Sequence, residues 1–325
     1  MRVLVTGGAG YIGSHVNKLL TSLGYETVVL DNLFRGHREL VKWGTFYEID
    51  LLDKKALKDL LCDEKVEAVM HFAALAYVGE SVKEPARYYE NNTVGSYNLL
   101  TAMMEAGVEN IVFSSTCAVY GDPEYVPMDE THPKKPVNPY GRSKLAVEFM
   151  LEDFAQACGL RYISLRYFNA AGADPDLETG EWHEPETHLI PNAIYTALGI
   201  RPYIEVFGSD YETEDGTCVR DFVHVSDLAK AHIKALEYLV SGGKSCALNL
   251  GTGRGYSVME VINLVERLSG SSVKVKHAPR RQGDPPVLVA NPGKAKEVIG
   301  WTPRYGIEDI IDTALRWYKK LLRLV

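Results

Sequence analysis

The chain has 325 residues, of which 46% are hydrophobic and 24% charged, the composition of an ordinary globular protein with one large or two moderate domains. Its 35 Lys and Arg stand against 43 Asp and Glu, which argues against nucleic-acid binding, and no apolar run approaches the roughly 18 residues of a membrane helix. The five scattered cysteines favour neither a disulfide framework nor a zinc site. The apolar run at the start of the chain is too short for a signal peptide, and together these two observations predict a cytoplasmic protein.

Strand and helix patterns alternate through the first half of the chain. Apolar runs typical of buried strands and helical spacings follow one another as strand 2–6, helix 12–23, strand 26–30, helix 56–61, strand 66–72, helix 85–106, strand 111–114, helix 139–157 and strand 162–167. Continuous apolar strands that alternate with amphipathic helices predict an α/β fold, namely a doubly wound parallel sheet of the Rossmann type with helices on both faces.

Beyond Asn169 this alternation ends. Gly, Pro, Glu and Asp crowd residues 172–187, and helical patterns at 225–239, 258–268 and 307–322 are separated by longer loops. We therefore expect residues 1–169 to form a nucleotide-binding domain. Residues 170–325 are expected to form a smaller lobe over the edge of the sheet, with some chain crossing back to the sheet.

The turn between the first strand and the first helix is rich in glycine. Residues 6–13 read Thr-Gly-Gly-Ala-Gly-Tyr-Ile-Gly, which places Gly7, Gly10 and Gly13 three residues apart. Glycines let a pyrophosphate approach the backbone, and the helix N-terminus supplies unpaired N–H groups. Plain tight turns use the same residues, but a position between a strand and a helix favours a dinucleotide site.

Asp31 ends the second strand, 18 residues past Gly13. A carboxylate at this place would accept hydrogen bonds from the adenosine ribose and repel a 2′-phosphate, so we predict NAD rather than NADP as the cofactor. Arg35 and Arg38 follow closely and complicate this preference, although the alternative for both is a solvated surface position.

Tyr140 and Lys144 stand four residues apart behind Pro139, which suits the first turn of a helix, so both side chains share one helix face. A tyrosine with a pKa of about 10 is a poor base, and we expect the Lys144 ammonium to lower that pKa, as an oxidised nicotinamide ring would. The alternative is an ordinary exposed Tyr–Lys pair. Residues 114–121, Ser-Ser-Thr-Cys-Ala-Val-Tyr-Gly, argue against it, because they put hydroxyls such as that of Thr116 at a strand end where open α/β sheets bind ligands.

The chain resembles the extended short-chain dehydrogenase/reductase family over essentially its whole length. The resemblance lies in the order of its motifs, which are a glycine loop, then Ser/Thr at a strand end, then Tyr-x-x-x-Lys. Further motifs narrow the resemblance to the nucleotide-sugar 4-epimerases of that family: residues 31–33, 88–92, 166–169, 210–217, 219–225 and 278–284. The resemblance implies an enzyme that interconverts UDP-galactose and UDP-glucose through a transient 4-keto sugar, with NAD bound tightly and not consumed.

The resemblance also implies roles for single residues. Tyr140 would deprotonate the sugar 4-hydroxyl, Lys144 would hold the phenolate and the nicotinamide ribose, and Thr116 would hydrogen-bond the same sugar oxygen. The implied cofactor contacts, besides Tyr140 and Lys144, are Gly7, Gly10, Tyr11, Ile12, Gly13, Asp31, Asn32, Leu33, Phe34, Arg35, Gly36, Asp50, Leu51, Phe72, Ala73, Ala74, Leu75, Ala76, Asn91 and Phe168. The implied substrate contacts, besides Thr116 and Tyr140, are Asn169, His188, Leu189, Phe207, Arg220, Arg281, Asp284 and Leu288.

Several of these residues have structural alternatives. Phe72 and Phe168 are also plausible core aromatics, Arg281 a surface ion-pair partner and His188 a structural histidine. The other histidines show no metal-ligand spacing, so we expect no metal site. By the same resemblance, the helices around 85–106 and 144–157 are expected to pair with a second copy in a homodimer.

Two positions depart from the pattern of the resembled group. Thr116 stands where many members have Ser, and Leu288 occupies a position that is Tyr in some members and Cys in others. Leu is intermediate in size, which leaves some tolerance for N-acetylated hexoses open.

Three other activities compete with this interpretation. A 4,6-dehydratase would need Asp-Glu directly after Thr116 to eliminate water, where this chain has Cys117-Ala118. A 4-epimerase of UDP-N-acetylhexosamine or UDP-glucuronate stays open. A non-catalytic NAD-binding regulator would need neither Tyr140 nor Lys144.

Overall fold

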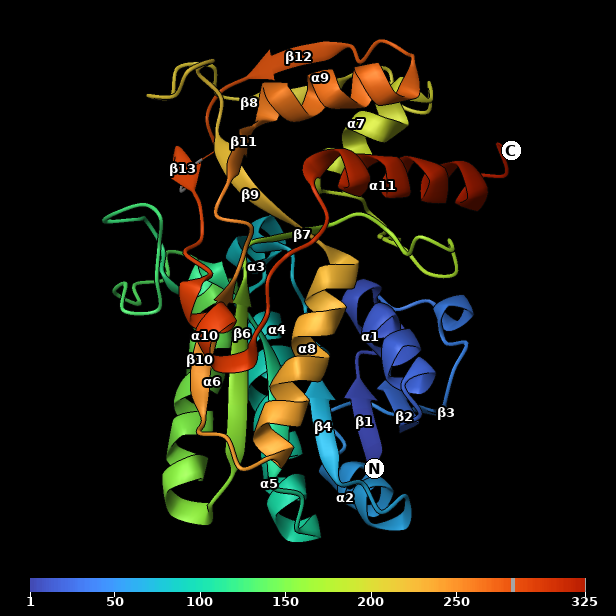
Figure 1. Ribbon diagram of the computed structural model, residues 1–325, viewed down its shortest axis with the longest axis vertical. Helices are drawn as coiled ribbons and strands as arrows, with labels where there is room; N and C mark the ends of the chain where they lie inside the picture. The colour runs from blue at the N-terminus through green and yellow to red at the C-terminus, as the bar shows by residue number, and fades with distance from the viewer. Residues whose placement is uncertain (282–283, 325) are drawn as a thin grey trace.

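The computed structural model describes residues 1–281 and 284–324. Gln282 and Gly283, which belong to the predicted motif at 278–284, lie outside the described residues, as does Val325. Figure 1 shows a large sheet with helices in the lower part of the molecule and a smaller group of strands and helices above it. None of the described helices is long and apolar enough to cross a membrane.

The large sheet has seven parallel strands in the order β10-β6-β5-β4-β1-β2-β3. Their bounds are β1 Arg2–Thr6, β2 Glu26–Asp31, β3 Thr45–Glu48, β4 Ala68–His71, β5 Asn110–Thr116, β6 Arg161–Tyr167 and β10 Cys246–Leu250. The central strands are buried along nearly their whole length, as expected for a sheet covered on both faces. The predicted fold class is therefore confirmed.

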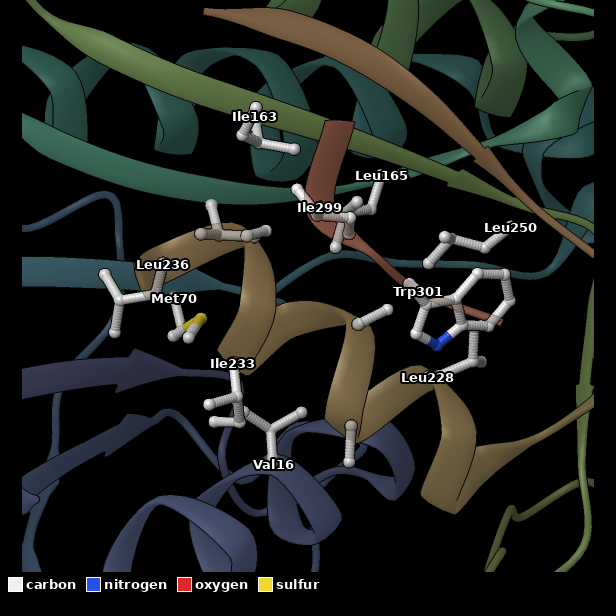
Figure 2. Packing of buried hydrophobic residues seen from close by; sticks show 14 of the residues in the cluster. Val16, Met70, Ile163, Leu165, Leu228, Ile233, Leu236, Leu250, Ile299 and Trp301 are labelled. Atoms are coloured by element: carbon white, nitrogen blue, oxygen red, sulfur yellow. The ribbon is translucent and has the colours of Figure 1, made fainter. Parts of the chain in front are cut away.

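Two sets of helices cover the sheet. On one face lie α1 (Tyr11–Ser22), α8 (Val225–Val240) and α10 (Gly293–Ile299), and on the other α2 (Lys54–Asp63), α5 (Gly95–Ala106) and α6 (Pro139–Cys158). Figure 2 shows the core of the first face, in which Leu228 and Leu236 of α8 belong to the same buried cluster as Leu165 of β6, with Trp301 beside Leu228. Apolar contact on both faces is the main stabilising force of such a layered fold.

The predicted helix at 85–106 forms with a different internal geometry. It is divided into α4 (Pro85–Tyr88), a wider π-helical turn η2 (Tyr89–Val94) and α5, and α3 (Val78–Lys83) precedes it. Such π turns occur where a helix places a side chain at a special position. In η2, the buried Asn92 accepts from the backbone N–H of Leu75 at 2.8 Å and donates to the Ser143 hydroxyl at 3.1 Å.

The upper part of the molecule contains short strands that join distant segments. β7 (Asn169–Ala171), β9 (Val219–His224), β11 (Gly255–Ser257) and β13 (Val287–Leu288) form one sheet, and β8 (Ile204–Phe207) pairs with β12 (Val275–Ala278). α7 (Leu189–Ala197), α9 (Val258–Ser269) and α11 (Ile307–Leu321) pack on them around a second apolar core. The strands of the large sheet point their carboxyl ends toward this part (Figure 1).

The chain does cross back to the large sheet after residue 170. α8 packs against α1, and β10 pairs with β6 at the sheet edge, before the chain returns to the upper part at β11. The division of the chain at residue 169 stays a prediction.

Candidate active site

A cleft of about 1760 Å³ runs between the carboxyl ends of the large sheet and the upper part of the molecule. The predicted site residues, taken from positions 7 to 288, all line this cleft except Leu33. Leu33 instead contributes its backbone N–H, which donates to Asp31 Oδ1 at 2.9 Å. The topology thus brings the predicted cofactor and substrate residues to one place, as expected for an open α/β sheet.

The glycine loop between β1 and α1 has no room for side chains. Gly7 has a φ of +71°, and a Cβ there would lie 2.5 Å from the backbone nitrogen of Ala73. A Cβ on Gly13 would lie 2.3 Å from the Gly7 carbonyl oxygen. Gly10 caps α1 without a side-chain hydrogen bond, so the first N–H groups of the helix are free for an anion. The loop fits the pyrophosphate of a dinucleotide.

Asp31 lies beside this loop and is buried. Its Oδ2 accepts from the Ala9 N–H at 3.1 Å, and burial raises the pKa of its carboxyl group. Arg35 also lines the cleft, but its guanidinium group already donates to Glu80 at 2.8 Å and to the Glu184 carbonyl at 2.8 Å. With Arg35 paired in this way, the Asp31 carboxylate fits the ribose hydroxyls of NAD better than the 2′-phosphate of NADP.

Tyr140, Lys144 and Thr116 meet at the end of β5. Asn138 caps α6 through its side chain, which accepts from the Gly141 N–H at 2.8 Å. From the first turns of α6, Tyr140 lines the cleft together with Thr116, and Lys144 donates to the Ser114 carbonyl at 2.9 Å. The predicted pair therefore shares one helix face beside a strand end, inside the protein.

The electrostatics of this pair differ from our expectation. Burial raises the pKa of Tyr140 to about 12, although the Thr116 hydroxyl favours the phenolate and lowers it. Burial also lowers the pKa of Lys144 to about 7. The expected lowering of the Tyr140 pKa by Lys144 is outweighed by burial, because desolvation disfavours both charges. A positively charged nicotinamide ring would supply the charge that favours the phenolate.

The opposite end of the cleft carries paired charges. Arg281 donates to Asp284 Oδ2 at 2.9 Å, and Arg220 lies 3.7 Å from Asp284 Oδ1. Arg281 is exposed and stands over the ring of Phe207, 4.7 Å from its centre. Two guanidinium groups beside an aromatic ring fit a nucleoside diphosphate, because each guanidinium offers paired planar donors.

Helix α7 opens at the same end of the cleft. His188 is its N-cap residue and makes no capping bond through its side chain, and Leu189 is the first helical residue. Asn169 donates to the Asp221 carbonyl at 2.9 Å, which holds its side chain at the base of the upper sheet. Leu288 packs beside Phe168 at the rim of a small apolar cluster.

One stretch of cleft lining was missed by the sequence analysis. Glu181, His183 and Thr187 line the cleft between the glycine loop and α7, although residues 172–187 were interpreted only as a loop. Three Glu and two His within eight residues, 181–188, were the available signal. Helical or strand periodicity could not reveal it, because the tract is irregular.

Comparisons with known proteins agree with this geometry. A sequence model described as the NAD dependent epimerase/dehydratase family matches residues 3–251. A UDP-glucose 4-epimerase of Rhizobium leguminosarum bv. trifolii is 54% identical over 98% of this chain and 97% of its own length. The crystal structure of UDP-glucose 4-epimerase from Brucella ovis in complex with NAD is 52% identical, covers 97% of this chain and 98% of its own, and superposes with a TM-score of 0.95.

A UDP-Glc/GlcNAc 4-epimerase from Campylobacter jejuni is similar as well, with 42% identity over 98% of this chain and 99% of its own and a TM-score of 0.86. The resemblance drawn from the sequence motifs is confirmed by these comparisons. The chain belongs to the NAD dependent epimerase/dehydratase family.

Proposed function

We propose that this protein is an NAD-dependent UDP-glucose 4-epimerase, which interconverts UDP-glucose and UDP-galactose. The observation that carries the proposal is the meeting of Tyr140, Thr116 and Lys144 in the same cleft as the glycine loop and the two arginines. Relatives about half identical over almost the full chain bear this name.

Each group of residues in the cleft has its own role in this reaction. The α1 N-terminus holds the pyrophosphate of NAD and Asp31 holds its adenosine ribose, and NAD supplies a hydride acceptor when bound. Tyr140 takes the proton of the sugar 4-hydroxyl, and the Thr116 hydroxyl, which lines the same part of the cleft, orients that oxygen. Lys144 in its ammonium form stabilises the phenolate, and a positively charged nicotinamide ring would favour the phenolate further. Return of hydride and proton to the other face of a 4-keto sugar completes the inversion.

The substrate is held mainly by its nucleotide. Arg220, Arg281 and the start of α7, which line the cleft, take UDP, and the hexose is held less firmly. A loosely held hexose can turn over between the two hydride transfers, which the reaction needs.

UDP-N-acetylhexosamines are a second candidate substrate class. Leu288, intermediate in size, lies at the rim of the hexose region beside Phe168. The Campylobacter jejuni relative is named for both UDP-Glc and UDP-GlcNAc, and a side chain smaller than Tyr at this position leaves some room for an N-acetyl group.

The test is incubation of the purified protein with UDP-galactose, without added NAD, and a coupled readout of UDP-glucose. We expect turnover from copurified NAD. Folded, NAD-loaded protein without turnover would remove the proposal. Formation of a 4-keto-6-deoxy sugar instead would identify a dehydratase, and UDP-GlcNAc and UDP-glucuronate in parallel assays decide the substrate range.

We also propose a homodimer in the cytoplasm. The outer surfaces of η2, α5 and α6 expose the large apolar side chains of Val94 (46%), Tyr97 (46%) and Phe149 (49%), which favours their burial against a second copy. The five cysteines are free, as in a reducing compartment. Light scattering at micromolar concentration should give twice the chain mass, and a monomer would contradict the dimer.

A further inference from the structure

Four side chains of the 181–188 tract converge on one point in the wall of the cleft. They are Glu181, His183, Glu186 and His188, and each contributes one potential ligand atom within 4.8 Å of all the others. Both glutamates are buried, while His183 and His188 reach the cleft. This glutamate–histidine cluster is separate from Tyr140, Lys144 and Thr116, and its only member with a proposed role in the reaction is His188, as a substrate contact at the start of α7.

The distances within the cluster suit a small cation. His183 Nδ1 lies 3.2 Å from Glu181 Oε1 and 3.8 Å from Glu186 Oε2, and His188 Nδ1 lies 3.8 Å from Glu186 Oε1. Ligand atoms about 2.0–2.2 Å from a tetrahedral Zn²⁺ are roughly 3.3–3.6 Å from one another, and these three spacings bracket that range. The fourth pair, His188 Nδ1 and Glu181 Oε1, shares a direct hydrogen bond, whose proton a bound ion would replace.

His183 supplies an independent sign of a missing partner. Its Nδ1 is buried and makes no hydrogen bond of acceptable geometry, although two carboxylates lie close to it. Buried polar atoms nearly always have a partner. A nitrogen lone pair that faces carboxylate oxygens is satisfied by a cation between them.

A second, acidic cluster in the same region is neutralised by a lysine side chain. Asp174, Asp176 and Glu178 also converge, and Lys18 Nζ sits among them at 2.7, 3.0 and 2.7 Å. Among the described residues, no lysine or arginine pairs with Glu181 or Glu186 in this way. Within the described residues, His183 and His188 are therefore the only side chains that can neutralise the two carboxylates of the glutamate–histidine cluster.

The surroundings hold the four ligands in place. Glu186 Oε1 accepts from the backbone N–H groups of Thr187 and His188 at 2.7 and 2.8 Å, and Glu186 Oε2 accepts from the Tyr318 hydroxyl at 3.2 Å. The Glu181 carbonyl accepts from the Trp317 indole at 2.8 Å. Such outer hydrogen bonds are what orients the ligands of metal sites.

We propose that Glu181, His183, Glu186 and His188 bind one divalent transition-metal ion, for which Zn²⁺ is the best match to two imidazole nitrogens and two carboxylate oxygens. The ion fixes the tract that joins the glycine loop, where His183 packs against the Tyr11 ring, to the start of α7. His188 would bind through Nδ1 and keep Nε2 for the cleft. This departs from our expectation of no metal, because the ligand spacing belongs to an irregular loop.

The test counts zinc on untagged, NAD-loaded protein. The protein is treated with a chelator, incubated with excess Zn²⁺ and freed of loose ions by gel filtration. Metal analysis should then find one zinc per chain in the wild type. His183→Phe keeps a ring against Tyr11 but removes one ligand, and should bind zinc at least about tenfold more weakly. Glu184→Gln, in the same tract but outside the cluster, should still bind one.

Glu181→Gln provides a second ligand variant if His183→Phe fails to fold. A wild type that retains no zinc overturns the proposal, and so does equal retention by the ligand variants and Glu184→Gln, because the ion would then sit elsewhere. Anomalous scattering at the zinc edge from crystals of the loaded protein should place the ion among the four side chains. Zinc is counted without substrate, so a failure here is distinct from a failure to epimerise.

Discussion

The two ends of the cleft are built by different means. The proposed cofactor end consists of backbone and buried groups, such as the glycine loop and Asp31 with its two N–H donors. The proposed nucleotide-sugar end consists of side chains, such as Arg281, whose side chain is 60% exposed and paired with Asp284. Groups fixed by packing are preorganised and release a ligand slowly, whereas exposed side chains must be ordered at each binding event.

The contrast explains how one cleft can keep a cofactor and exchange a substrate. A permanently held NAD would need a site that exists before binding, and the rigid glycine loop is the proposed one. A UDP-sugar that enters and leaves in each cycle suits arginines that already pair with an acid and can exchange partners. The predictions below test this difference, from the largest effect to the smallest.

Tyr140→Phe removes the only hydroxyl proposed to take the substrate proton. We expect turnover to fall by about 10²–10⁴-fold, with bound NAD unchanged, because the glycine loop is untouched. Tyr125→Phe, at an exposed tyrosine outside the cleft, is the control and should keep full activity. A near-normal rate in Tyr140→Phe would make the proton-transfer role wrong.

Gly7→Ala tests whether the cofactor end depends on backbone shape. The new Cβ would meet the Ala73 backbone at 2.5 Å, at a φ of +71°, so we expect loss of copurified NAD and a free energy of unfolding lower by roughly 2–5 kcal/mol. Gly24→Ala has a φ of +85° with nothing within 4 Å, and should lose only about 1–2 kcal/mol and keep NAD. The NAD retained by each variant is measured by absorbance. Loss of NAD in Gly7→Ala but not in Gly24→Ala would assign the loss to the steric clash rather than to the strained φ angle that both variants share.

The charge of the bound cofactor should control Tyr140. Burial favours the neutral phenol and raises its pKa to about 12, while a nearby positive charge favours the phenolate and lowers the pKa by about one to three units. Tyrosinate absorbance, taken as the difference between wild type and Tyr140→Phe, should therefore rise at lower pH with NAD⁺ bound than after chemical reduction to NADH. A phenol that stays protonated in both states up to strongly alkaline pH would exclude Tyr140 as the base.

Arg281→Ala probes the nucleotide-sugar end, with its neighbour as control. Loss of a charge-assisted contact to the diphosphate should raise the KM for UDP-galactose about 10–100-fold and leave NAD in place. Arg280 pairs with Asp210 at 2.7 Å and does not line the cleft, so Arg280→Ala should change little. Equal effects of the two variants would show that Arg281 acts only through surface charge.

Asp31→Ala should give the smallest effect, on cofactor choice. Without the carboxylate we expect the preference for NAD over NADP to weaken by about tenfold. Asp31→Asn removes the negative charge but keeps an acceptor for the Ala9 or Leu33 N–H, so it separates the effect of the charge from that of the hydrogen bond. Competition between the two nucleotides during refolding measures the ratio, and an unchanged selectivity in both variants would count against a ribose contact.

The sequence predicted those parts of the fold whose pattern is local. The central strands are buried on both faces and appear as unbroken apolar runs. β3 was missed because Thr45–Glu48 is half exposed at a sheet edge, and β10 because Cys246–Leu250 lies far along the chain from β6, which it joins. Strands of two to six residues in the upper part pair over long distances, and no local pattern marks them.

The site was predictable where chemistry follows fixed spacing. The glycine loop and the Tyr140–Lys144 pair are defined by intervals of three and four residues, and the structure brings both to the cleft. The electrostatic effect of Lys144 was not predictable, since it depends on burial around the pair. The convergence of Glu181 with His183, Glu186 and His188 depends on an irregular loop, whose path the sequence does not encode in any repeating pattern.

The return of α8 and β10 to the large sheet has a consequence for the integrity of the molecule. A chain cut after residue 169 would leave β6 as an unprotected outer strand and strip α8 from the apolar surface around Leu165 and Met70. Such a fragment would expose an unpaired strand edge and an apolar surface, and would aggregate. The path of the backbone therefore links the proposed cofactor region to the proposed sugar region, so neither can be removed or transplanted without the other.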